Sequence, residues 1–271
     1  MLFAEFVDRI AGWYARLGRQ AGGSAGLMGT FDGMQAGYQL WPRLRVNGFF
    51  GFPVDSTREG PDSERRFVGV SADVGTLANA WDFSFYAVDQ QYSGVTDRQA
   101  VGTEVRYFRP GITIVGLADF DVHYSTLNTV LLLGTFALPA RWTLNLNLDH
   151  RTSPGLSTRN AMIGQPVRRF DELFGLYTPQ EIEQLALDRT SESTMYSAGV
   201  SRPFGERWQW SLDASTMTLG STRESGGVAA TPSSGTDTAV STQAMGYGLF
   251  GRGDVTSLGL QYQTGESSQM L

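Results

Sequence analysis

The sequence predicts an all-β fold, in which an antiparallel up-and-down meander of about 12 strands forms an incomplete transmembrane β-barrel with one short helix in a long loop. Three observations lead to this prediction. Apolar and polar residues alternate in many segments, short turns alternate with long polar connections, and tryptophans gather beside the short turns.

The alternation is clearest between residues 142 and 150, where the side chains run in the order Trp142, Thr143, Leu144, Asn145, Leu146, Asn147, Leu148 and Asp149. A period of two predicts a strand with one apolar and one polar face. The pattern recurs at 67–74, 81–89 and 208–219, and less regular strands are expected at 26–40, 44–52, 98–108, 112–123, 127–138, 193–202, 238–250 and 255–264. Most of these segments have about 9 to 12 residues, and a tilted strand needs about 9 to 11 to cross a bilayer.

The connections between these strands are of two kinds. Short ones with proline and glycine are expected at 41–43, 75–80, 109–111, 139–141, 203–207 and 251–254. Longer or more polar ones alternate with them at 53–66, 89–97, 152–192 and 220–237, and only the brief connection 124–126 breaks the alternation. Because outer-membrane barrels have short periplasmic turns and longer external loops, we expect the short turns on the periplasmic side.

Five of the six tryptophans flank these short turns, namely Trp41, Trp81, Trp142, Trp208 and Trp210. Tryptophan is enriched where a membrane meets water, so the five residues predict an interface belt at the periplasmic rim. The belt predicts that the protein lies in the bacterial outer membrane, with lipid as its partner.

Two segments depart from the strand pattern. Thr178, Pro179 and Glu181 predict the start of a helix inside the connection 152–192, because they match an N-cap, a first-turn proline and a capping box. Residues 1–22 are amphipathic and predict either a helix or a degenerate strand. We therefore expect this N-terminal segment to be followed by the barrel at 23–271.

Both ends of the predicted barrel lie on the side of the long loops, because strand 26–40 runs toward a short turn and strand 255–264 runs away from one. Bacterial barrels normally begin and end in the periplasm. The polar tail 265–271 also lacks the terminal aromatic residue of a closing strand. We therefore expect a barrel that is truncated at the C-terminus and lacks at least one closing strand.

The polar faces of the strands predict the lining of a wet lumen. The candidate residues are Asp73, Asp82, Glu104, Arg106, Asp119, Asp121, Asn145, Asn147, Asp149 and Asp213. Their balance is acidic, and charged groups lose little solvation in a water-filled channel.

Catalytic and metal-binding arrangements are not apparent in the sequence. Asp119, Asp121 and His123 share a strand face, but neighbours on one face lie about 6 to 7 Å apart along a strand, too far for all three to bind one ion easily. A Walker-type phosphate loop requires a lysine, and all 21 basic residues are arginines. The sequence predicts neither an enzyme, a metal site nor a cofactor.

Composition excludes several classes of protein. A net charge of −6 argues against nucleic acid as a partner, since phosphates require basic patches. No apolar run is long enough for a transmembrane helix. The absence of cysteine excludes a disulfide scaffold and is compatible with passage through an oxidising periplasm.

Four stretches, at 37–47, 51–55, 163–167 and 226–232, resemble the barrel portion of large proteobacterial outer-membrane proteins with periplasmic tetratricopeptide repeats. The resemblance implies helical repeats upstream of Met1 as periplasmic partners in the same longer chain. It also implies an architecture similar to that of exopolysaccharide-export porins. It assigns no functional residue.

The sequence therefore predicts a pore for passage or export of a hydrophilic solute, with a polysaccharide as the expected cargo and the connection 152–192 as the gate. A structural barrel, such as an adhesin anchor or a protein-secretion pore, is an alternative. A soluble ligand-binding β-protein is another, and it predicts that Phe83, Phe85, Leu144, Leu146 and Leu148 point into a closed core. An outer-membrane enzyme would require serine, histidine and carboxylate groups clustered at one rim.

Overall fold

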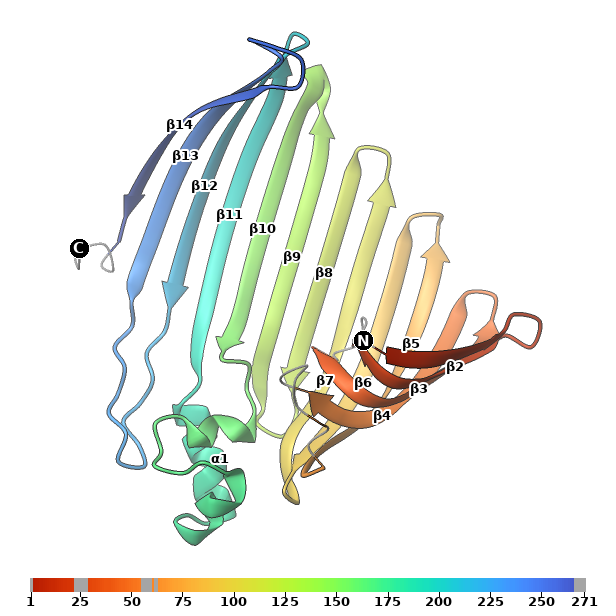
Figure 1. Ribbon diagram of the computed structural model, residues 1–271, viewed down its shortest axis with the longest axis vertical. Helices are drawn as coiled ribbons and strands as arrows, with labels where there is room; N and C mark the ends of the chain where they lie inside the picture. Colours follow the sequence, from red (N-terminus) through yellow and green to blue (C-terminus); the bar gives the residue numbers. More distant parts are fainter. Residues whose placement is uncertain (1, 22–28, 55–59, 61–62, 266–271) are drawn as a thin grey trace.

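The computed structural model describes residues 2–21, 29–54, 60 and 63–265. These residues form one antiparallel sheet of 14 strands, in which each strand pairs with its neighbours along the chain (Figure 1). The strands are β1 (Leu2–Asp8), β2 (Trp13–Ala21), β3 (Thr30–Trp41), β4 (Leu44–Val54), β5 (Arg65–Leu77), β6 (Trp81–Tyr92), β7 (Val95–Arg109), β8 (Ile112–Asp121), β9 (Thr126–Leu138), β10 (Trp142–Ser153), β11 (Ser191–Phe204), β12 (Trp208–Leu219), β13 (Gly235–Tyr247) and β14 (Val255–Thr264).

The helical elements lie in two connections. The 3-10 turn η1 (Pro139–Arg141) joins β9 to β10, whereas η2 (Thr158–Met162), η3 (Phe170–Gly175) and the α-helix α1 (Pro179–Asp188) lie between β10 and β11. Helix α1 has the predicted capping box at Thr178 and Glu181. In the described part of the chain, no helix has the length and apolarity needed to cross a bilayer.

The predicted all-β meander is confirmed, but the estimate of 12 strands is wrong because the N-terminal segment contributes two more. Strands β1 and β2 pair from Leu2 opposite Arg19 to Asp8 opposite Trp13, so the helical alternative is wrong for residues 2–21, the described part of the segment 1–22. The turn between them is stabilised locally, since the Asp8 carboxylate accepts hydrogen bonds from the backbone of Ile10 and Ala11.

The two ends of the sheet carry connections of different length, as the sequence predicts, except at residues 89–97. At the turn end, strands are joined by tight turns such as Pro42–Arg43 and Pro110–Gly111, and the opposite end, the loop end, carries the segment with α1 (Figure 1). The expected long connection 89–97 is instead a two-residue turn at Ser93 and Gly94, both with positive φ. Of the predicted strand 26–40, residues 26–28 lie outside the described residues, as does the tail beyond Gly265.

The sheet is open in the described residues, with β1 and β14 as its edges. Strands β1 to β5 turn sharply away from the direction of β8 to β14, so the sheet is strongly curved (Figure 1). Strand β1 begins at the loop end and runs toward the turn end, and β14 begins at the turn end and runs back to the loop end.

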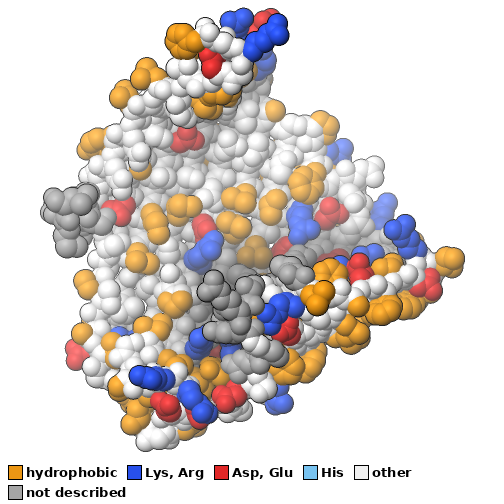
Figure 2. Space-filling model, viewed as in Figure 1, with side chains coloured by type: hydrophobic (Ala, Val, Ile, Leu, Met, Phe, Trp, Pro, Cys, Tyr) orange, Lys and Arg blue, Asp and Glu red, His pale blue; other side chains and the backbone are white. Residues whose placement is uncertain are grey.

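The two faces of the sheet have different compositions. We call the face that carries Trp142, Leu144, Leu146 and Leu148 the apolar face, and the face that carries Thr143, Asn145, Asn147 and Asp149 the polar face. Apolar-face side chains are widely exposed, for example Val70 at 59% and Phe85 at 50%, and Figure 2 shows hydrophobic side chains gathered along the outer side of β2 to β5. Polar-face side chains such as Phe31 and Tyr86 are buried, so the polar face is the concave, inner one.

Glycines on the polar face allow this curvature. In three rows across the sheet, a glycine lies between side chains of the two neighbouring strands; the rows are Tyr14–Gly37–Asn47, Phe49–Gly69–Val88 and Tyr86–Gly102–Asp119. A Cβ atom on the central glycine would lie 2.1 to 2.3 Å from the aromatic ring of its row. The ring therefore fills the space that a side chain would need, as in aromatic rescue of strand glycines.

Gly102→Ala is expected to destabilise the fold by about 1 to 3 kcal/mol, the usual cost of overpacking. The new methyl group would lie 2.3 Å from Tyr86 ring atoms and 2.6 Å from the Ala118 carbonyl oxygen. Gly116→Ala is the matched control, because a Cβ there would have its nearest contacts at 3.8 Å. Urea titration of both variants measures the difference, and equal stabilities would contradict the role of the ring in holding the curve.

Candidate functional site

The ten predicted lining residues all lie on the polar face. The register connects Asp73, Asp82, Glu104, Arg106, Asp119, Asp121, Asn145, Asn147, Asp149 and Asp213 through direct cross-strand partners or through even steps along one strand. They do not form one cluster. Asp73 and Asp119 take part in hydrogen-bond networks that cross several strands, whereas the other eight have local contacts, are exposed or have a buried oxygen without a described partner.

The first network crosses β2 to β6 near the turn end. Gln35 Nε2 donates to Tyr14 Oη at 2.9 Å, and Tyr14 Oη donates to Asn47 Oδ1 at 3.0 Å. Asn47 Nδ2 then donates to Asp73 Oδ2 at 2.8 Å, and the Ser84 hydroxyl donates to Asp73 Oδ1 at 2.7 Å. These bonds fix an array of amide, hydroxyl and carboxylate groups on the inner face.

The second network is centred on Asp119 near the loop end. Asp119 Oδ2 accepts hydrogen bonds from Tyr86 Oη at 2.7 Å and from Arg98 Nη2 at 2.6 Å. Its Oδ1 accepts one from Asn128 Nδ2 at 3.0 Å, and Asn128 Oδ1 accepts from the backbone N–H of Leu156 at 3.2 Å. Asp119 therefore connects β6, β7 and β9 and, through Asn128, the segment that follows β10.

Asp119, Asp121 and His123 were expected on one strand face, but β8 ends at Asp121, and the three side chains have different partners. Asp121 is fully buried and accepts the backbone N–H of Tyr124 at 3.0 Å, while its Oδ2 has no hydrogen-bond partner among the described residues. His123 lies beyond the end of β8, and its Nε2 is 3.2 Å from Glu183 Oε1 of α1. Within the described ranges, no group of three or more histidine, aspartate or glutamate side chains is arranged to hold a metal ion.

The other predicted residues have local contacts. Asp82 accepts from the Thr76 hydroxyl at 3.0 Å, and Glu104 pairs with Arg106 at 2.6 Å. Asn145 accepts from the Thr135 hydroxyl at 3.0 Å, and Asp149 pairs with Arg151. Asp213 is exposed, and Asn147 Oδ1 is buried without a partner in the described structure. No arrangement of nucleophile and base was found among these ten residues.

Residues 154–190, which we call the cap, fold into a small unit at the loop end. Its 3-10 turns and α1 enclose a core of Ala161, Phe170, Leu173, Ile182, Leu185 and Ala186. Tyr92, at the end of β6, joins this core and stacks on Phe170 with ring centroids 4.4 Å apart. The cap is therefore packed against the loop end of the sheet.

Polar contacts also hold the cap in place. The Thr158 hydroxyl donates to the Thr96 carbonyl at 2.6 Å and contacts Tyr124 Oη, and Ser157 donates to Asp97. Burial under the cap raises the pKa of Tyr124 above its usual value. The backbone N–H of Thr178, followed by its hydroxyl, lowers the pKa of Glu181, so the capping box keeps its charge at neutral pH.

Neither a protein-family model nor a curated protein matches the chain. The roles of its residues are therefore argued from position, burial and contacts alone.

The tryptophan belt has one more member than the sequence predicts. The five predicted residues lie at the turn end on the apolar face, and Trp13, at the start of β2, lies there as well. Trp142 and Trp210 meet edge to face, with ring centroids 5.9 Å apart. Trp13 was not predicted as a member of the belt because residues 1–22 also match a helical pattern. A helix there would place no turn between strands beside Trp13.

Several residues of the networks were not predicted, chiefly Tyr14, Asn47, Tyr86, Arg98 and Asn128. Strand alternation places Tyr86 on the polar face, which is the signal that could have identified it. Its contact with Asp119 joins residues 33 positions apart and depends on Gly102 between them.

Proposed function

We propose that this sheet is the wall of an outer-membrane β-barrel pore through which a hydrophilic solute passes along the polar face. The observation that carries the proposal is the division of the sheet into an exposed apolar face, with six tryptophans at its turn end, and an inner face with hydrogen-bonded polar residues. Membrane barrels have this division, with lipid outside and water inside.

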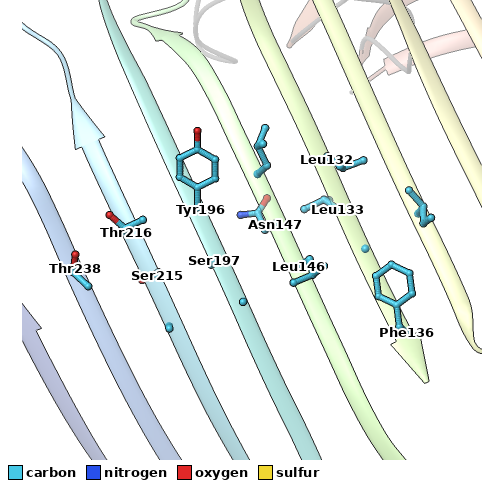
Figure 3. A pocket seen from close by; sticks show the side chains of 15 residues that line it. Leu132, Leu133, Phe136, Leu146, Asn147, Tyr196, Ser197, Ser215, Thr216 and Thr238 are labelled. Carbon is cyan, nitrogen blue, oxygen red and sulfur yellow. The ribbon is translucent and has the colours of Figure 1, made fainter. Parts of the chain in front are cut away.

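The extent of the apolar face supports lipid as its neighbour. Soluble monomers rarely expose large contiguous apolar patches. A groove of about 640 Å³ on this face is bordered by Leu132, Phe136, Leu146 and Tyr196, which stand on β9, β10 and β11 (Figure 3). An acyl chain has the apolar surface needed to cover such side chains.

Several polar residues of the apolar face lie toward the loop end and are paired with one another. Arg19 donates to both carboxylate oxygens of Asp32, at 2.8 and 2.7 Å. Arg66 donates to Gln91, and Gln99 donates to Asp89 at 2.7 Å. These pairs fit the position where an apolar band gives way to lipid headgroups.

The soluble alternative requires the opposite arrangement. It predicts Phe83, Phe85, Leu144, Leu146 and Leu148 in a closed core, but these residues lie on the exposed apolar face, with Phe85 at 50% and Leu146 at 43%. Their placement favours the membrane barrel.

A structural barrel with a plugged interior is the second candidate. It is favoured by the buried cluster Phe31, Phe49, Phe67, Tyr86 and Val88 on the polar face, which fills part of the inner space between β3 and β6. Conductance across a planar bilayer distinguishes the two candidates, because a plugged barrel would insert without conducting ions. A polysaccharide cargo and upstream helical repeats stay predictions.

Single-cysteine labelling tests the proposed function, since the chain has no cysteine of its own. In lipid vesicles, a water-soluble thiosulfonate should label Asn145→Cys and leave Leu146→Cys unlabelled, because neighbouring strand residues point to opposite faces. Both variants should react in the urea-unfolded chain. Equal labelling of the folded variants would overturn the membrane assignment.

A further inference from the structure

A cavity of about 560 Å³ lies on the polar face at the turn end, where β1 to β5 curve around it. Its volume is within the range of about 300 to 1,000 Å³ that is typical of small-molecule sites. The Asp119 network contributes none of its lining residues, and the cavity is far along the strands from the cap.

The formal charges of the cavity lining cancel. Three acids and three arginines contribute to it, namely Glu5, Asp8, Asp73, Arg9, Arg16 and Arg45. Glu5 and Arg16 form an ion pair at 2.6 Å, and the Arg45 guanidinium lies over the Tyr14 ring, 5.8 Å from its centroid. A strongly charged ligand therefore gains no attraction from the net charge of the lining, so the lining favours an uncharged ligand.

The lining also offers fixed hydrogen-bonding groups beside apolar surface. Gln35, Tyr14, Asn47 and Asp73 are held by the network that crosses β2 to β6, so donors and acceptors keep their positions without a ligand. Val7, which is 56% exposed, supplies apolar surface in the lining. A sugar ring presents hydroxyl groups at its rim and C–H groups on its face, and both match this lining.

We propose that this cavity binds an uncharged, polyhydroxylated solute, of the size of a few sugar units, at the turn-end mouth of the pore. The inference rests on the proposed function, because the polar face must be the route of the solute. Gln35 keeps one amide N–H and its carbonyl oxygen for the hydroxyls of the solute, and each Asp73 carboxylate oxygen keeps a lone pair.

Calorimetric titration of the full chain in detergent micelles tests the site. Maltotriose, cellotriose and isomaltotriose serve as neutral probes, and trigalacturonate is the acidic counterpart. At least one neutral trisaccharide should bind more tightly than trigalacturonate. Absence of binding by all three neutral probes, or tighter binding of the acidic one, would overturn the proposal.

Asn47→Ala should weaken binding of the best neutral probe about tenfold, because Asn47 holds Tyr14 and Asp73 in place in the lining. Asn145→Ala is the control, since Asn145 lies on the same face but outside the cavity. Gln35→Ala is a second variant with the same expected direction if Asn47→Ala does not fold. Equal weakening by the control would place binding elsewhere and contradict the site.

Conductance of the same protein, transferred from detergent into a planar bilayer, separates this inference from the proposed function. A conducting chain that binds none of the neutral probes would refute the cavity site and leave the pore in place. A chain that binds them without conducting would support the cavity site and contradict the pore.

Discussion

Asp119→Ala is expected to lower the free energy of unfolding by about 3 to 5 kcal/mol, the cost of breaking a buried ion pair by removing one partner. The Asp119 side chain is 1% exposed and accepts hydrogen bonds from Tyr86, Arg98 and Asn128. Its removal would take a charge-assisted partner from the Arg98 guanidinium, whose side chain is only 11% exposed. Urea unfolding in lipid vesicles, followed by tryptophan fluorescence, measures the change in the free energy of unfolding.

The same variant should loosen the cap. The Asn128 side chain donates to Asp119 and accepts the backbone N–H of Leu156. Without the Asp119 carboxylate, the side-chain carbonyl of Asn128 is no longer held in position to bind Leu156. Hydrogen exchange should therefore rise in residues 154–190 more than in β12 to β14. Asp213→Ala is the control on the same face, and because Asp213 is exposed its effect should stay within about 0.5 kcal/mol. Unchanged exchange in the cap would contradict the linkage.

Most of the strands could be predicted because alternation and turns agree. Strands β12 and β14 have the predicted bounds, 208–219 and 255–264, since each begins directly after a glycine-containing turn. The N-terminal strands were ambiguous because Leu2, Phe6, Ile10 and Leu17 fit a helical stripe as well as a strand, and pairing between β1 and β2 decides the matter.

The turn at Ser93 and Gly94 was missed for a different reason. Asp89, Gln90 and Gln91 are polar, and polar residues between two strands suggest a loop. In the structure they continue β6, where Asp89 pairs with Gln99 and Gln90 with Arg98. A strand that extends past an apolar band needs no apolar side chains there, so composition alone cannot fix its end.

The polar face could be predicted, whereas its networks could not. Alternation assigns a face to each residue, and all ten predicted residues share one. The contacts depend on the register between strands and on glycines that let a ring lean over the middle strand. Tyr86 reaches Asp119 because Gly102 lies between them, and a sequence does not state which glycine is opposite which ring.

Leu132→Arg and Leu133→Arg should have very different effects if lipid covers the apolar face. The two leucines are adjacent on β9 and similarly exposed, at 48% and 40%, but the register places Leu132 on the apolar face and Leu133 on the polar face. An arginine that faces lipid near the middle of a bilayer costs about 2 to 4 kcal/mol, so Leu132→Arg should be destabilised by that amount in vesicles. Leu133→Arg should be nearly neutral, because its guanidinium would enter a wet interior.

The two variants separate burial in a membrane from exposure to water. Leu132 and Leu133 lie on opposite faces of the sheet but have nearly the same exposed fraction. In water, a surface leucine changed to arginine has little effect on stability on either face. A loss confined to Leu132→Arg therefore requires an apolar medium against that face, and urea unfolding of both variants in the same vesicles measures it. Equal small effects would remove the reason to place lipid there, and a larger loss for Leu133→Arg would point to an apolar interior, as a soluble β-barrel has.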